Sequence, residues 1–238
     1  MKLRPCVVFS SGILGTGKTT TMKKFAEIVD NAFYMDRDDI IPAMLHVPTV
    51  DLSGLLKFRD YVENDGIFPG SVSFTDTPFG EMMKLDPTNN LGFNSDFYRR
   101  HIRDQSYLVQ LYLARTNLDF GKVPVIDCIT MRQIQDGTVG RFRNHSFFTG
   151  IDTFHFHFVV DEGECYRRYL ARLAGNVEYD KKRYPMNKRL SREEFHKFVT
   201  EEQPMVPTEL GNYEHLVIDT TRDSPEKCAR KCIQYISK

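Results

Sequence analysis

Apolar runs alternate with amphipathic stretches along most of this chain, and the alternation predicts an α/β protein. Short apolar or alternating runs predict five strands, at residues 5–10, 33–35, 123–127, 153–160 and 215–219. A period of three to four residues predicts helices at 17–30, 95–120, 162–174 and 225–236. Strands that alternate with helices favour a mostly parallel sheet covered by helices on both faces. We expect one domain over residues 1–238.

Residues 41–94 break this regular alternation. Proline and glycine recur through the segment, at Pro42, Pro48, Gly54, Gly66, Pro69, Gly70, Pro78, Gly80, Pro87 and Gly92. Such residues interrupt any long helix or strand. We therefore expect an insertion after the second strand, placed so that it shapes the side of the molecule where a second substrate binds.

The turn between the first strand and the first helix carries the most specific motif in the chain. Gly12, Gly17, Lys18 and Thr19 fill the pattern G-x-x-x-x-G-K-[ST], which binds phosphates. Glycines let backbone N–H groups face phosphate oxygens, and the following helix points its positive end at the same anion. The residues expected to contact a nucleotide are Gly12, Gly15, Thr16, Gly17, Lys18, Thr19 and Thr20. The motif predicts ATP as the nucleotide, with Lys18 at the β- and γ-phosphates and Thr19 as a ligand of Mg²⁺.

The composition bears on the compartment and the binding partners of the protein, but not on its chemistry. The 238 residues carry 32 basic and 32 acidic side chains, so no net charge attracts the whole chain to nucleic acid or a membrane. The five cysteines are scattered, which is typical of free thiols in a reducing compartment. With neither an apolar leader nor a membrane-spanning run, we expect a cytoplasmic protein with no membrane partner.

Several carboxylates follow predicted strands, where side chains of a parallel sheet face a ligand. Asp127 ends an apolar strand and is the expected second support for Mg²⁺, with Asp76 as a weaker candidate. Asp36, Asp38 and Asp39 crowd the end of the second strand. One of these three is a candidate general base, although a turn that caps the next helix would also use such residues.

Basic residues gather in the second half of the chain. Arg168 and Arg172 share one helical face and could stabilise a phosphoryl group in transfer. With the basic run that follows, they predict a lid over about residues 165–192. Arg141 and Arg143 could bind an acceptor phosphate or belong to an ordinary surface loop. His155 and His157 alternate on one strand without a third ligand, which favours a structural role.

These motifs together resemble the phage-type polynucleotide 5′-kinases and their wider family of small P-loop kinases. The resemblance rests on the glycine-rich loop, on Arg37-Asp38-Asp39, on the strand that ends at Asp127, and on the arginine pair. It implies that Asp38 is the base that activates an acceptor hydroxyl and that the arginine pair belongs to the lid. An arginine that closely follows the Arg-Asp-Asp motif in polynucleotide kinases is missing here, where Ile40, Ile41 and Pro42 stand. Related phage kinases phosphorylate hydroxymethylated bases in DNA, such as 5-hydroxymethyluracil, which fits a modified acceptor site.

The sequence thus predicts an ATP-dependent kinase whose acceptor is a hydroxyl of a nucleotide or nucleic acid. A kinase of the same fold for a small molecule or a nucleoside monophosphate is an alternative, which the zero net charge favours. A nucleotide switch or ATPase that binds a partner would keep Lys18 but would not require Asp38.

Overall fold

The computed structural model describes residues 1–36, 103–129, 131–135, 137–175, 189–202 and 204–238. Several predictions lie outside these residues. They are the insertion at 41–94, the start of the helix expected at 95–120, the candidates Asp38, Asp39 and Asp76, and the basic residues 181–188.

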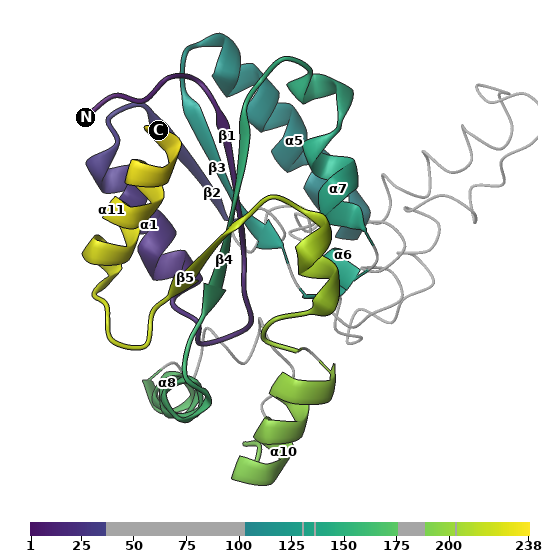
Figure 1. The fold of residues 1–238 in the computed structure, drawn as a ribbon, viewed down its shortest axis with the longest axis vertical. Helices are drawn as coiled ribbons and strands as arrows, with labels where there is room; N and C mark the ends of the chain where they lie inside the picture. Colours follow the sequence, from purple (N-terminus) through teal and green to yellow (C-terminus); the bar gives the residue numbers. More distant parts are fainter. Residues whose placement is uncertain (37–102, 130, 136, 176–188, 203) are drawn as a thin grey trace, which may run out of the picture.

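A five-stranded parallel sheet forms the centre of the molecule (Figure 1). Its strands are β1 (Val7–Ser11), β2 (Ala32–Asp36), β3 (Val123–Ile129), β4 (Thr153–Val159) and β5 (Leu216–Asp219). They lie in the order β2-β3-β1-β4-β5, and all the pairs run parallel. The predicted α/β class and parallel sheet are therefore confirmed. This order places the carboxyl ends of β1 and β3 side by side, with Ser10 opposite Asp127.

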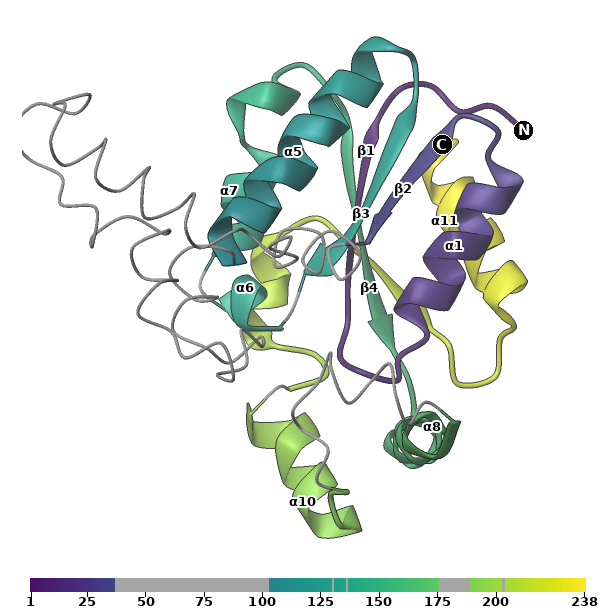
Figure 2. The same cartoon turned by 180° about the vertical axis from the view of Figure 1, so that it is seen from behind.

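Helices cover both faces of the sheet, as Figures 1 and 2 show. On one face lie α1 (Lys18–Ile28) and α11 (Pro225–Ile236), which pack against each other. On the other face lie α5 (Arg103–Asp119), α6 (Met131–Gln135) and α7 (Thr138–Arg143). Two further helices, α8 (Glu162–Gly175) and α10 (Arg192–Lys197), lie beyond the carboxyl ends of the strands. Short helical segments complete the chain: η3 (Ser146–Phe148), η4 (Phe198–Glu202) and η5 (Thr208–Asn212).

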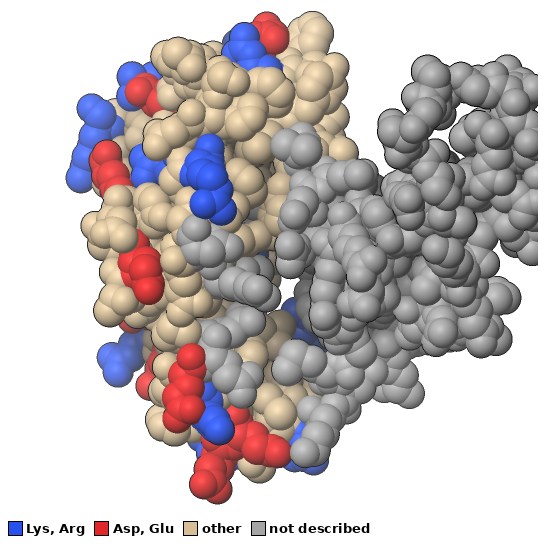
Figure 3. Space-filling model, turned by 90° about the vertical axis from the view of Figure 1, so that its right-hand side faces the viewer, with Lys and Arg blue, Asp and Glu red and all other residues tan. Residues whose placement is uncertain are grey.

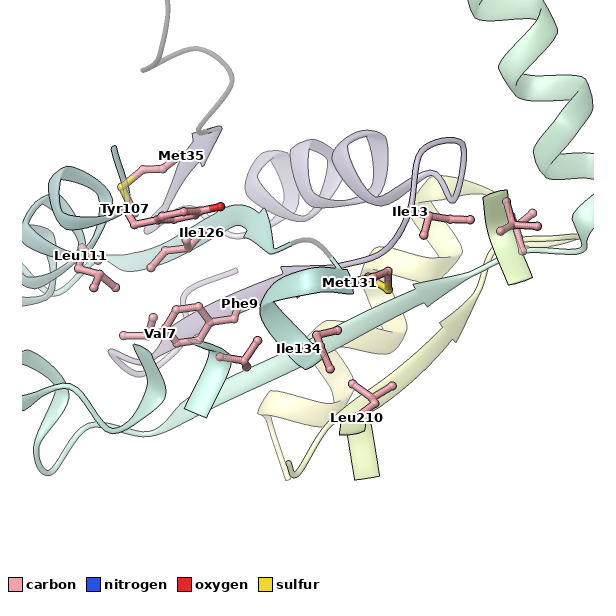
Figure 4. Packing of buried hydrophobic residues seen from close by; sticks show 14 of the residues in the cluster. Val7, Phe9, Ile13, Met35, Tyr107, Leu111, Ile126, Met131, Ile134 and Leu210 are labelled. Carbon is pink, nitrogen blue, oxygen red and sulfur yellow. The ribbon is translucent and has the colours of Figure 1, made fainter. Parts of the chain in front are cut away.

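Alternate residues of β1 supply two separate hydrophobic cores. Val7 and Phe9 pack towards α5 and α6, where Figure 4 shows them beside Tyr107, Leu111 and Ile134. Val8 packs towards α1 and α11 on the opposite face. Because successive strand residues point to opposite faces, the last two residues of β1, Ser10 and Ser11, also face different sides.

The structure adds elements that the hydrophobic pattern did not predict. Residues 131–148 contain α6, α7 and η3, where the sequence analysis predicted no helix or strand. A further helix, α10, begins at Arg192, where the expected lid ends, and runs to Lys197. In the described part of the chain, no helix combines the length and the apolarity needed to cross a bilayer.

Candidate functional site

The glycine-rich loop runs from the end of β1 to the start of α1, as its motif predicts. Gly17 precedes the helix with a φ of 76°, a left-handed conformation that glycine adopts without strain. A Cβ on Gly12 would lie 2.8 Å from the Thr16 hydroxyl oxygen and 2.9 Å from the Phe158 carbonyl oxygen, so the close packing excludes a side chain. Thr16 itself is buried and donates its hydroxyl to the carbonyl of Ile13, which stabilises the loop from within.

The amino end of α1 has the features of an anion site. No side chain caps it, and its first turn contains no acidic residue. The first backbone N–H groups of any helix have no partner within that helix. Lys18, Thr19 and Thr20 supply such groups here, and the positive end of the helix dipole adds to their attraction for a phosphate.

Asp127 lies at the centre of a buried polar cluster beside this loop. Its Oδ1 accepts hydrogen bonds from Ser10 Oγ at 2.9 Å and from Lys18 Nζ, with which it also forms an ion pair. Its Oδ2 accepts from Thr19 Oγ1 at 2.7 Å and from Tyr34 OH at 2.9 Å. The structure therefore brings Lys18 and Thr19 into contact with Asp127, which lies more than 100 positions away from both in sequence.

The charge state of this cluster follows from its surroundings. Burial acts to raise the pKa of Asp127, but the charge of Lys18 and the hydrogen bonds from Lys18, Thr19 and Tyr34 together hold that pKa below its usual value. Burial raises the pKa of Tyr34, and the neighbouring carboxylates Asp127 and Asp36 raise it further. Asp127 is therefore an anion, and Tyr34 is a neutral donor at neutral pH.

The residues present fit a nucleotide-bound magnesium ion. Mg²⁺ prefers oxygen ligands and usually takes one or two carboxylates together with substrate phosphates and waters. Thr19 and Asp127 offer a hydroxyl and a carboxylate oxygen 2.7 Å apart, next to the helix end where phosphates would bind. Among the described residues, no group of three or more His, Cys, Asp or Glu side chains could hold a metal without such a substrate.

Arg168 contacts the glycine-rich loop from α8. Its guanidinium donates to the carbonyl of Gly15 at 3.2 Å and to the Thr220 hydroxyl and carbonyl at 3.0 and 2.8 Å. Glu164 accepts from its Nε at 2.7 Å, and hydrogen bonds from Arg167 and Arg168 lower the pKa of this carboxylate. Thr220 closes the ring by donating to the carbonyl of Thr16 at 2.7 Å. In this state Arg168 braces the loop.

Three further candidate residues, Arg172, Asp36 and Arg143, lie on three different elements of the fold. Arg172 is half-buried in the last turn of α8, one turn beyond Arg168. Asp36 ends β2 directly opposite Asp127, so this carboxylate lies at the same sheet edge. Arg143 donates to Thr153 and to the carbonyl of Glu214, contacts that favour the structural alternative for this residue.

The two strand histidines form a second buried cluster, on the opposite face from Asp127. Ser11 Oγ lies 2.7 Å from His155 Nε2 and 2.8 Å from His157 Nδ1. His157 Nε2 lies 2.7 Å from the Met205 carbonyl, so it must be the protonated nitrogen and Nδ1 must accept from Ser11. His155 Nε2 then donates to Ser11, and its buried Nδ1 has no partner. The pair is structural, as the sequence pattern favoured.

Sequence reasoning missed Ser10, Tyr34, Glu164 and Thr220. Ser10, Tyr34 and Thr220 act through residues far away in the chain, so their contacts depend on how the strands are arranged. Glu164 is different, because it lies four residues before Arg168 on the same helix, a spacing that is visible in the sequence. One local signal was present for Tyr34, since it alternates with the apolar Phe33 and Met35 in β2 and so faces the same side as α1.

The surface charge does not favour one kind of binding partner. Figure 3 shows basic and acidic side chains interspersed over the described part of one face. Beyond the sheet, Glu162 of α8 pairs with Arg192 and His196 of α10 at 3.4 and 2.8 Å. These ion pairs lie largely at the surface, where each contributes little to stability.

No protein-family model and no curated protein matches this chain in sequence. Among solved structures, one from Chloroflexus aurantiacus J-10-fl, provisionally described as a kinase, is similar with a TM-score of 0.56 and 14% identity. That similarity covers 97% of this chain and 98% of the other. The Mycobacterium tuberculosis APS kinase CysC, in complex with AMPPNP and APS, gives 0.48 at 13% identity over 99% of both chains. The shikimate kinase from Acinetobacter baumannii, in complex with shikimate, gives 0.47 at 13% identity over 98% of this chain and 93% of the other.

Only the first of these three similarities exceeds a TM-score of 0.5, and at such identity it shows the fold alone. With the strand order and the glycine-rich loop, it establishes the architecture of this chain. The chain has the α/β fold of the Chloroflexus structure, with a five-stranded parallel sheet between two layers of helices.

Proposed function

We propose that this chain is an ATP-dependent kinase that transfers the γ-phosphoryl group to an acceptor hydroxyl. One observation carries the proposal: the P-loop lysine and threonine both contact a buried strand-end carboxylate. Phosphoryl transfer relies mainly on positioning and on neutralising charge. A cation, a hydroxyl and a carboxylate beside an uncapped helix end supply both.

The described residues have separate tasks in this reaction. The backbone of Gly15, Gly17 and the first turn of α1 would bind the phosphates, and Lys18 would contact the β- and γ-phosphate oxygens. Thr19 and Asp127 would hold Mg²⁺, which when bound supplies positive charge between the phosphates. In the observed structure Arg168 contacts the loop at the carbonyl of Gly15.

Further roles complete the proposal. Asp38 would accept the proton of the acceptor hydroxyl, as the resemblance to small P-loop kinases implies. Asp36, at the same sheet edge as Asp127, is the alternative base. Arg172 and Arg168 would neutralise charge on the transferred group. Arg168 must leave Gly15 and Thr220 before it can do so.

The acceptor in this proposal is a nucleotide or a nucleic acid, with a DNA 5′-hydroxyl or a hydroxymethylated base as the first candidates. The Arg-Asp-Asp motif after β2 supports it. A small-molecule or nucleoside acceptor is the second candidate, and the balanced charge of the chain, 32 basic against 32 acidic residues, favours it. Salt separates the two, because DNA binding weakens steeply as salt rises.

A transfer assay with ATP labelled in the γ-phosphate tests the proposal. The acceptor panel contains 5′-hydroxyl oligonucleotides, hydroxymethylated DNA and nucleosides. We expect label on one acceptor class, lost in Lys18→Ala, and lost in Asp38→Asn while ATP still binds. Label that appears only as free phosphate would instead support an ATPase or a nucleotide switch.

A further inference from the structure

Asp127 has hydrogen-bond donors of two different kinds. Ser10 and Tyr34 belong to β1 and β2, the two strands that flank β3. Lys18 and Thr19 belong to the amino end of α1, where a nucleotide would bind. Each carboxylate oxygen accepts one bond of each kind. Oδ1 takes Ser10 and Lys18, and Oδ2 takes Tyr34 and Thr19.

The two strand donors are held firmly in place. Ser10 is completely buried, and its hydroxyl also approaches the carbonyl of Ile126 at 3.4 Å. Tyr34 is half-buried, packs against the core beneath α1, and has Lys23 Nζ 5.6 Å from its ring centroid. Both residues lie in parallel ladders with β3, so their backbones are fixed beside that of Asp127. The donors from α1 are only half-buried and lie at the helix end where phosphates would bind, so their side chains can turn from Asp127 to a ligand.

We propose that Ser10 and Tyr34 are positioning residues that hold Asp127 while Lys18 and Thr19 exchange between this carboxylate and a bound nucleotide with its metal. This inference rests on the proposed function, since it assumes that ATP binds at the loop. It extends that function by assigning two residues outside the P-loop motif and by stating what nucleotide binding must break.

The exchange has an electrostatic consequence. Among the described residues, Lys18 is the cation that pairs with Asp127, whose side chain has no exposed surface. When Lys18 moves to the phosphates, a buried carboxylate loses its counter-charge, which is strongly unfavourable. A divalent cation at Thr19 and Asp127 restores the balance. Nucleotide binding through Lys18 is therefore coupled to Mg²⁺.

Calorimetric titration with a non-hydrolysable ATP analogue, in EDTA and over a series of Mg²⁺ concentrations, measures this coupling without any acceptor. For the unmodified chain we expect Mg²⁺ to strengthen binding by about tenfold or more, within the usual range of coupling between two ligands. In Asp127→Asn, the ion pair between Lys18 and residue 127 is already absent before the nucleotide binds. We therefore expect binding in EDTA to become several-fold tighter and the effect of Mg²⁺ to fall towards unity.

Tyr34→Phe tests the positioning role, because it removes one hydroxyl and keeps the ring. We expect the Mg²⁺ concentration needed for half-maximal strengthening to rise about fivefold, slightly less than is usual when an outer-shell partner of a metal ligand is removed. Binding in EDTA should change less than twofold. The matched control is Tyr235→Phe, whose hydroxyl donates to Glu214, two residues before β5, the strand at the opposite edge of the sheet from β2. It should leave both values unchanged.

Two failures remain distinguishable. If the unmodified chain binds no ATP analogue with or without Mg²⁺, the proposed function fails. If the unmodified chain binds it but Tyr34→Phe and Tyr235→Phe share the same Mg²⁺ dependence, the positioning role is wrong. Circular dichroism of each variant, with thermal unfolding, shows that the comparison is made between folded proteins.

Discussion

Ser10 and Ser11 are neighbours at the end of β1, both completely buried, and they face opposite sides of the sheet. Ser10 donates to Asp127 in a cluster that contains a cation, an anion and three hydroxyls. Ser11 bridges His155 and His157 in a cluster that carries no charge at neutral pH. Two adjacent serines therefore belong to two different clusters, one charged and one neutral.

The two clusters differ in whether a ligand could replace some of their hydrogen-bonded side chains. The cluster at Asp127 borders the amino end of α1, so a phosphate and a metal can replace its mobile members. The histidine cluster ends in the carbonyl of Met205 and includes a buried nitrogen without a partner. It ties β1 and β4 to the segment that follows η4. In our proposal the first cluster exchanges partners with a ligand, whereas the second holds the end of β1 against β4.

The largest expected effect concerns the Asp127 cluster and the rate of phosphoryl transfer. Lys18→Ala removes the cation that would meet the β- and γ-phosphates, and loss of one such electrostatic contact costs about 10²- to 10³-fold in rate. Phosphoryl transfer measured with labelled ATP should fall by that factor. The fold should persist, because the pair with Asp127 forms on a helix that is also held by its packing against α11. A variant with unchanged transfer would remove Lys18 from the site.

The next effect belongs to the histidine side and appears as pH dependence. Burial lowers the pKa of His155 to about 3 and that of His157 to about 4. Both pKa values lie below the value of about 6.5 in an unfolded chain, so the unfolded state takes up protons first as pH falls. Stability contributed by the neutral pair is complete above pH 6.5 and declines below it. By pH 5 the loss is about 2 kcal/mol for each histidine.

Urea unfolding at pH 7 and pH 5 measures this loss. His157→Asn should remove about half of the histidine contribution to the difference between the two pH values. An equal pH dependence in the variant and the unmodified chain would contradict the burial of a neutral histidine there.

A smaller effect separates the two serines directly. Ser11→Ala leaves two buried ring nitrogens without a partner, and such a loss costs about 1–3 kcal/mol of unfolding free energy. Ser10→Ala should destabilise the protein by a similar amount, because Asp127 retains its other donors but loses one charge-assisted bond. Only Ser10→Ala should also raise the Mg²⁺ concentration needed for nucleotide binding. If both variants raise it equally, the two faces of β1 do not differ in function.

The smallest expected effect comes from a helix cap outside both clusters. It serves as a reference for the other serine substitutions. Ser224 caps α11 by accepting a hydrogen bond from the backbone of Lys227 at 3.2 Å. Ser224→Ala should lower stability by about 1 kcal/mol, the usual value for such a cap, with no change in pH or Mg²⁺ dependence. A larger loss would mean that serine substitutions in this chain act through something other than their local bonds.

Local patterns in the sequence predicted much of the fold. The motif around Lys18 identified the turn between β1 and α1, and the alternation of Phe154, Phe156 and Phe158 with two histidines identified β4. The period of three to four residues over 225–236 correctly predicted the last helix, α11. These features depend only on residues close together in the chain, so one sequence is enough to find them.

Other elements could not be found in the same way, or their signals were missed. Residues 131–148 form helices of three to six residues, interrupted by Gly137, too short for a clear hydrophobic period. For α10 a signal existed: Ser191 and Glu194 form a reciprocal capping box, a pattern visible in the sequence.

The candidate site shows the same division. Lys18, Thr19 and Asp127 were predicted because each belongs to a known local pattern. Tyr34 was not, because its contact with Asp127 depends on β2 lying beside β3, and strand order is a non-local property. The assignment of Asp38 stays a prediction, since this residue lies outside the described part of the chain.

A crystal structure with a non-hydrolysable ATP analogue and Mn²⁺, located by its anomalous signal, tests the central claim most directly. Our account predicts the phosphates at the amino end of α1 and the metal at Thr19 and Asp127. Lys18 should have moved from Asp127 to the phosphates, while Ser10 and Tyr34 keep their bonds to it. A nucleotide bound elsewhere, or one bound at the loop while Lys18 remains on Asp127, would contradict the account.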